Sequence, residues 1–215
     1  MTVFNILQPR STLRLCFIAI VASVALLPAG SHAEPANGMP SFQYSTQAST
    51  PIIEYNLIHH MLAEPDPEPL LRIYGNGRVH VHYPAYMTKA GNYEVQLSQS
   101  ELRALMRSLI TDGIIDFDPA AVRSQRQQLN AQQRAATGTM FYISDSSDTV
   151  IDIRLNEYQK GPGTARVLNL EKRFIWPDLK QDAMRFPQLR EITNANNAAQ
   201  RLDTLLHRDD LVKIR

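Results

Sequence analysis

The feature that most constrains the fold is a glycine-flanked turn between two β-rich runs at residues 70–83, LLRIYGNGRVHVHY. Branched and aromatic residues on both sides of the GNG turn at 75–77 are a strong signal for a β-hairpin. A two-residue loop would place Ile73 opposite His80 and mix apolar with polar side chains on each face. A three-residue loop with Gly77 in the left-handed conformation separates them. We therefore predict the three-residue loop.

This loop gives the hairpin two faces of opposite character. The apolar face comprises Leu71, Ile73, Val79, Val81 and Tyr83. The cationic and aromatic face comprises Arg72, Tyr74, Arg78, His80 and His82. Its composition is typical of interaction surfaces, and its histidines would gain charge as the pH falls through about 6.5. These five residues are the candidate binding residues.

Strands and amphipathic helices follow the hairpin. Residues 93–97 predict a strand that runs into a capping box, Ser98 with Glu101, and then a helix with one apolar stripe that ends at Gly113. Later elements are a polar helix from Asp118-Pro119, a hairpin of runs 139–144 and 149–155, a strand within 165–176, a short helix capped by Asp178, and a last helix over 189–207. A further strand begins at Pro51, before the hairpin.

Consecutive strands joined by tight turns, with helices inserted between them, indicate an α+β fold. We expect a single domain over residues 51–215, with a mainly antiparallel sheet of about five to seven strands and helices packed on one face. The cationic face of the hairpin would then meet water or a partner.

Residues 1–33 have the three-part order of a secretory signal. Arg10 and Arg14 precede an apolar run from Leu15 to Ala29, and small residues lead to a cleavage site between Ala33 and Glu34. The run is shorter than the ~20 apolar residues of a membrane-spanning helix. We predict a cleaved signal peptide and an exported protein, periplasmic or secreted, without stable membrane insertion after cleavage. Retention as an uncleaved anchor is the alternative.

Cleavage would leave a nearly neutral chain without cysteine. Residues 1–33 contain two arginines, no acidic residue and the only cysteine, Cys16, so their removal changes the formal net charge from +1 to −1. A nucleic-acid partner is disfavoured because it requires a surplus of basic residues. Disulfides and thiol catalysis are excluded in the cleaved chain. Residues 34–50, rich in Pro, Ser, Gln and Thr, are expected to form a flexible leader.

The pair His80 and His82 is the sharpest chemical candidate. Alternate strand residues project side by side, so two neutral imidazoles could hold zinc or copper, and His59 and His60 could add ligands. Arg72, which opposes His80 in the predicted register, would repel such a cation. Outward polar positions of an amphipathic strand are the simpler interpretation, and we expect no cofactor.

Other features carry no assigned chemistry. The acidic pairs 145/148, 178/182 and 209/210 are explained as turn residues, helix caps or a solvated terminus. Sequence motifs of nucleophile elbows, metalloprotease helices, phosphate-binding loops and calcium-binding loops do not occur in the chain. Catalytic residues remain unassigned, as does the role of the Gln-rich segment 123–133.

The segment over residues 70–113 resembles a group of exported proteobacterial proteins of unassigned function, which share a glycine-flanked hairpin followed by a capped helix. In layout, the chain is also similar to emfourin-type inhibitors of metalloproteases. His59-His60 stands where that resemblance implies a Gly-Gly pair after the first strand.

Three functional hypotheses follow. The first is a non-enzymatic binding protein of the cell envelope that contacts another protein or an envelope component through the hairpin face. The second is a periplasmic metal-binding protein that uses His80 and His82, or a secreted protein that resembles protease inhibitors. The third is a hydrolase with dispersed catalytic residues. The oligomeric state is left open.

Overall fold

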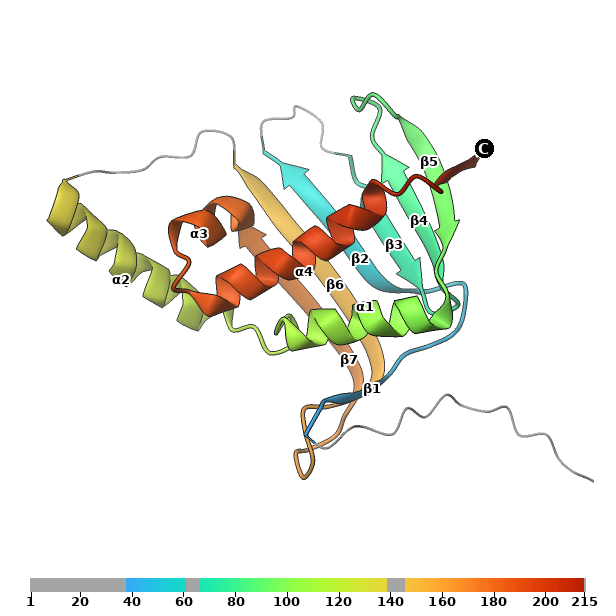
Figure 1. Cartoon of the computed structure of the whole chain (residues 1–215), viewed down its shortest axis with the longest axis horizontal. Coiled ribbons are helices and arrows are strands. Elements are labelled where there is room, and N and C mark those ends of the chain that lie inside the picture. Colours follow the sequence, from blue (N-terminus) through green and yellow to red (C-terminus); the bar gives the residue numbers. More distant parts are fainter. Residues whose placement is uncertain (1–37, 61–65, 139–145, 215) are drawn as a thin grey trace, which may run out of the picture. The chain divides into compact units, whose positions relative to one another are not determined.

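The computed structural model describes residues 38–60, 66–138 and 146–214. Figure 1 shows the elements in chain order. The strands are β1 (Ser41–Gln43), β2 (Pro51–His59), β3 (Leu71–Tyr74), β4 (Arg78–Tyr83), β5 (Gly91–Gln96), β6 (Ser147–Gln159), β7 (Val167–Pro177) and β8 (Val212–Ile214). The helices are α1 (Gln99–Thr111), α2 (Pro119–Thr137), α3 (Leu179–Arg185) and α4 (Arg190–Leu206).

The described strands form one antiparallel sheet. Strands β2, β3, β4, β5 and β8 follow one another from the centre to one edge, and β6 lies on the other side of β2. Both β7 and β2 pair with residues 148–153 of β6, so they occupy opposite edges of that strand. Because β7 also covers β6 as far as Tyr158, β1 must share the edge that β2 occupies.

The predicted hairpin register is confirmed. Leu71 pairs with Val81, Arg72 with His80, and Ile73 with Val79. Gly77 has the positive φ of 92° that the turn requires. Its N–H closes the turn by donating to the carbonyl of Tyr74 at 2.9 Å. A Cβ at Gly77 would lie 2.3 Å from the carbonyl oxygen of Leu97, so a side chain is excluded by contact as well as by conformation.

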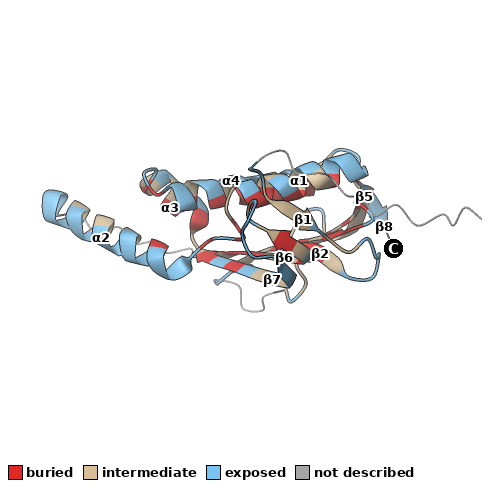
Figure 2. Ribbon diagram, turned by 90° about the horizontal axis from the view of Figure 1, so that it is seen from below, coloured by how far each residue is buried: buried red, intermediate tan, exposed pale blue. Residues whose placement is uncertain are grey.

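Helices cover one face of the sheet only, as Figure 2 shows in an edge-on view. The capping box of α1 is present: Ser98 Oγ accepts from the N–H of Glu101, and the Glu101 carboxylate accepts from the N–H of Ser98. The apolar stripes of α1 and α4 face the sheet. Fully buried members of the core include Ile53, Leu71, Ile73, Val79, Leu102, Met106, Ile153, Trp176, Ile192 and Leu202.

Helix α2 is the least buried of the described helices. Val122 is its only buried residue, which agrees with its polar sequence. Its contacts with the rest of the domain include the guanidinium of Arg126, 3.0 Å from the carboxylate of Asp182, and that of Arg123, 5.7 Å from the ring of Trp176. Asp182 is 1% exposed and also accepts a hydrogen bond from Trp176 Nε1 at 2.8 Å.

Residues 34–215 form one compact unit, and the predicted α+β class with helices on one face is confirmed. Within the described residues the sheet has eight strands, against the predicted number of about five to seven. The additional pairing comes from three-residue strands that periodicity does not detect. One of them, β1, lies within the predicted flexible leader 34–50, which is thereby corrected for residues 41–43.

Two further points concern individual predictions. Asp178 precedes α3 but its side chain does not cap the helix; its carboxylate instead accepts from Ser147 N–H and Ser146 Oγ, both at 3.3 Å. The predicted run 139–144 and the signal segment 1–33 lie outside the described residues. Within the described ranges, no helix is long and apolar enough to cross a membrane.

Candidate functional site

The helix-free face of the sheet carries a row of ionisable side chains that crosses six strands. Strand register places one residue of each strand in line: Arg173 (β7), Asp152 (β6), Glu54 (β2), Arg72 (β3), His80 (β4) and Glu94 (β5). We call these six residues the charged row. Each has at least one apolar neighbour in its own strand on the opposite face of the sheet, because successive strand residues alternate between faces.

Carboxylates and guanidinium groups of the row are paired with one another and with flanking residues. Glu54 lies between two cations: Arg154 Nη1 is 2.6 Å and Arg72 Nε is 3.8 Å from its carboxylate oxygens. Arg72 Nη1 also lies 2.6 Å from Glu68. The Arg173 guanidinium is 3.4 Å from Asp152. Burial nevertheless raises the pKa of Asp152, since it outweighs the attraction of Arg173.

Arg78 and Tyr74 form a stacked pair at the turn end of the hairpin. The Arg78 guanidinium lies 4.0 Å from the ring centroid of Tyr74 and donates to Glu94 at 3.0 Å and to the carbonyl of Ala48 at 3.0 Å. Tyr74 is only 8% exposed. This pair therefore stabilises the turn end and offers little ring surface to a partner.

His82 is held from both sides of its ring. Its Nδ1 lies 2.7 Å from Asn92 Oδ1 and 3.3 Å from a Glu68 oxygen, and its Nε2 lies 3.0 Å from Asp66. Only the imidazolium form can donate from both nitrogens. Burial, the largest single influence, lowers the pKa of His82, but the hydrogen bonds with Asn92 and Asp66 and the nearby carboxylates together raise it.

The structure corrects the predicted cationic patch. All five predicted residues lie on the helix-free side of the hairpin, but Arg72, Arg78 and His82 are paired with carboxylates from neighbouring segments. These are Glu54, Asp66, Glu68 and Glu94. Local spacing in the sequence places no carboxylate beside the histidines, because it does not show which residues of β2 and β5 lie across the strands. The surface is a network of paired charges.

His80 and His82 do not form a metal-type cluster. No group of three or more His, Cys, Asp or Glu side chains suited to a metal ion occurs in the three described segments. Both ring nitrogens of His82 already have oxygen partners. His80 Nε2 is buried and has no hydrogen-bond partner among the residues described. The metal-binding hypothesis thus gains no support from this geometry.

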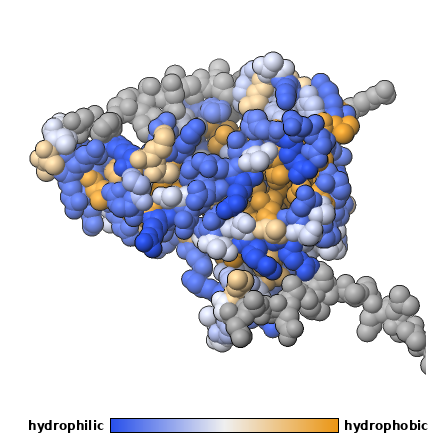
Figure 3. Space-filling view, in the orientation of Figure 1, coloured by the Kyte–Doolittle hydropathy of each residue, from blue (hydrophilic) through white to orange (hydrophobic). Residues whose placement is uncertain are grey.

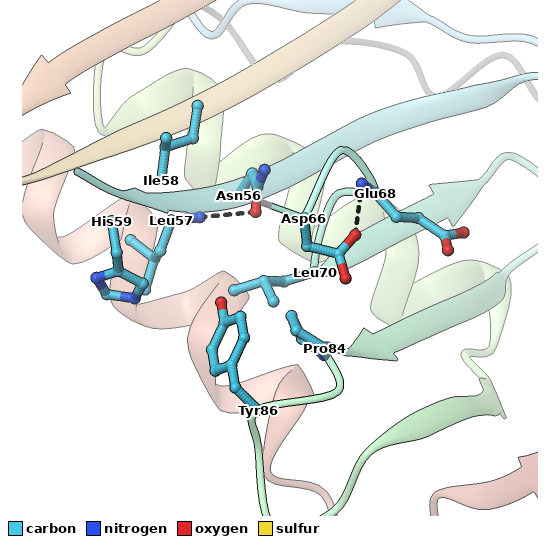
Figure 4. Close-up of a pocket in the computed structure, with 9 residues that line it drawn as sticks. All are labelled: Asn56, Leu57, Ile58, His59, Asp66, Glu68, Leu70, Pro84 and Tyr86. Atoms are coloured by element: carbon cyan, nitrogen blue, oxygen red, sulfur yellow. Dashed lines mark hydrogen bonds between the residues drawn. The ribbon is translucent and has the colours of Figure 1, made fainter. Parts of the chain in front are cut away.

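A small cavity lies between the end of β2 and the loop before β3. His59, which ends β2 rather than following it, and Tyr86 line it together with Asp66, Glu68 and Leu70. Figure 4 shows Leu70 and Tyr86 in the space between His59 and Asp66. Its volume of about 10 Å³ holds roughly one water molecule, so it is too small for an organic ligand.

A larger cleft lies farther along the sheet, where β6 and β7 meet the connection from β1 to β2. Its volume is about 160 Å³. It is lined by Ser45, Thr50, Pro51, Ile52, Arg154, Leu155, Asn156, Asn169, Leu170 and Glu171. No local motif marks these residues in the sequence, because their proximity depends on a long-range strand pairing.

The opposite side of the domain differs in surface chemistry. Figure 3 views the helix-covered side, which is mostly hydrophilic apart from an apolar strip between α1 and α4.

Comparison of the chain with protein-family models, with curated proteins and with solved structures finds no match.

Proposed function

We propose that the protein is an exported, non-enzymatic binding protein of the cell envelope, and that a protein partner contacts the helix-free face of its sheet. The observation that carries this proposal is the charged row, which presents ionisable side chains from six adjacent strands on a face without helices. Paired charges on such a face favour a partner of complementary charge pattern and disfavour other contacts.

The exposed end of the row is the part best placed for contact. The Arg173 side chain is 61% exposed, whereas Arg72 and Glu54 are about one quarter exposed or less. Taking paired charges out of water costs free energy, which is repaid only where good geometry and further hydrogen bonds compensate. We therefore place the centre of the partner surface at the β6–β7 side of the row, away from the buried Tyr74 and His82.

Charge reversal tests this surface. Tagged protein carrying Arg173→Glu, purified from its own host, is expected to lose a co-purifying partner while its thermal unfolding midpoint stays near the wild-type value. Arg107→Glu, at an exposed position on α1, serves as the matched control and should retain the partner. Retention by Arg173→Glu, or loss by Arg107→Glu alone, would contradict the proposal.

Export is tested separately by mass. The intact mass of the protein from the host's periplasm or medium should match residues 34–215, with Glu34 as the first residue. A chain that keeps residues 1–33 and stays in the cytoplasm would remove the envelope assignment without affecting the binding face.

A further inference from the structure

Asn156 is the one residue of β6 that has a strand partner on neither edge. On one edge, pairing with β2 ends at Ile153 and pairing with β1 begins at Glu157, so residues 154–156 have no strand partner there. On the other edge, the register with β7 skips Asn156 and Asn169. Peptide N–H and C=O groups without a strand partner are satisfied by other backbone groups, by side chains, by water or by a ligand.

The interruption on the β7 side has a local cause. Asn169 has φ 50°, a left-handed conformation that breaks strand geometry and that asparagine adopts more readily than most residues. Both Asn156 and Asn169 are exposed. Two carboxamides, each with donors and an acceptor, therefore line the cleft beside the gap.

The charges that line the cleft cancel. Arg154 and Glu171 are register partners on adjacent strands. Arg154 also donates to Glu54 at 2.6 Å and to the carbonyl of Pro51 at 3.1 Å. A ligand with a strong net charge of either sign would disturb this balance, so the cleft favours a neutral ligand.

The remaining lining combines hydroxyl and apolar groups. Ser45 and Thr50 contribute hydroxyl groups, while Pro51, Leu155 and Leu170 contribute aliphatic surface. Amides and hydroxyls both donate and accept, as do the hydroxyl groups of a sugar, and the aliphatic surface suits its C–H groups. The volume of about 160 Å³ is far above the 10–15 Å³ that one water needs.

We propose that this cleft binds one neutral acetamido-sugar unit. The sugar hydroxyls would contact Asn156, Asn169 and Glu171, and the acetamido group would pair with the peptide groups that β6 leaves without a strand partner. The site goes beyond the proposed protein-binding function and does not depend on it, since its lining excludes every residue of the charged row.

Titration followed by NMR tests the ligand class. Purified protein receives N-acetylglucosamine, glucose, glucosamine or glucuronic acid in parallel. We expect N-acetylglucosamine to shift the amide signals of residues 154–156 and 169–171, and glucose to bind roughly tenfold more weakly because it lacks one hydrogen-bonding amide. The two charged sugars should bind less well than N-acetylglucosamine. Absence of these shifts, or equal binding of the charged sugars, overturns the proposal.

Asn169→Gly is the sharpest variant. Glycine keeps the left-handed conformation and removes the carboxamide, so we expect roughly tenfold weaker binding of N-acetylglucosamine with an unchanged thermal midpoint. Arg107→Ala, on α1, should bind as the wild type does. If Asn169→Gly is not folded, Asn156→Ala gives the same readout. Wild-type affinity in folded Asn169→Gly or Asn156→Ala overturns the assignment, whereas loss of the protein partner in Arg173→Glu leaves it intact.

Discussion

The two faces of the sheet are built from the same strands but differ in how their side chains are satisfied. On the helix-covered face, Ile53, Ile73 and Ile153 have no exposed surface and need only apolar neighbours of suitable shape. On the helix-free face, Glu54, Arg72 and Asp152 each need a specific charged or hydrogen-bonding neighbour. Apolar packing is non-directional, whereas paired charges depend on the identity and register of the strand next to them.

This difference implies different consequences of substitution. Removal of a core side chain leaves a cavity and costs its full packing energy. Removal of a partly exposed charge leaves a partner that water can solvate. Four substitutions test that contrast.

Ile73→Ala is expected to have the largest effect. The side chain is fully buried beneath the helices, so its truncation should lower the free energy of unfolding by about 2–5 kcal/mol. Denaturant titration measures this. A loss below about 1 kcal/mol would show that the core under α1 and α4 is loosely packed.

Asp182→Ala tests a polar group on the covered side. Asp182 is 1% exposed and accepts from Trp176 Nε1, so the variant leaves a buried indole N–H without its acceptor. We expect the free energy of unfolding to fall by about 1–3 kcal/mol. The loss should not be larger, because the partly exposed Arg126 can turn to water. Asp182→Asn, which can still accept from the indole, should recover part of this loss. Equal losses in both variants would contradict the role of that hydrogen bond.

The interaction of His82 with Asp66 and Glu68 predicts a pH dependence. The pKa of His82 is raised in the folded state, so its contribution is complete below about 6.5 and disappears as the pH rises through the folded value. Hydrogen bonds lower the pKa of Asp66, chiefly through His82, and of Glu68, chiefly through Arg72. The contribution of these carboxylates is present above about 4 and is lost as the pH falls through their folded values.

The destabilisation caused by His82→Gln should therefore be larger near pH 6 than near pH 9. Denaturant titrations of both proteins at the two pH values measure this difference. The same loss at both pH values would mean that the ring acts by packing alone.

Arg173→Ala should have the smallest effect on stability. The side chain is 61% exposed and its ion pair with Asp152 is 3.4 Å long, so we expect a change below about 0.5 kcal/mol that shrinks further in high salt. A loss above about 1 kcal/mol would show that the row supports the fold, and would weaken Arg173→Glu as a test of binding alone.

The sequence predicts the apolar side chains of the helix-covered face well. Alternation in the hairpin and the capping box of α1 correctly assign Leu71, Val79 and Leu102 to the core, because each signal lies within a few neighbouring residues. Three-residue strands such as β1 were missed, since so few residues carry no periodicity and depend on pairing with β6.

The partners of the polar side chains on the helix-free face depend on long-range strand register. The polar positions of the hairpin were assigned to the correct face, but their neutralisation by Glu54 and Glu94 follows from the pairing of β2 with β3 and of β4 with β5. The cleft beside Asn156 depends on the pairing of β1 and β2 with β6, which is distant in the chain, and on a left-handed residue that no motif marks. No local pattern contains that information.

Site-specific photo-crosslinking from the two faces, in the living host, shows which face contacts a partner. A photoreactive residue at position 173, on the helix-free face, is expected to give a discrete adduct with a partner, and one at position 107, on α1, is expected to give none. An adduct from position 107 alone would contradict the account, as would no adduct from position 173 in folded, correctly exported protein.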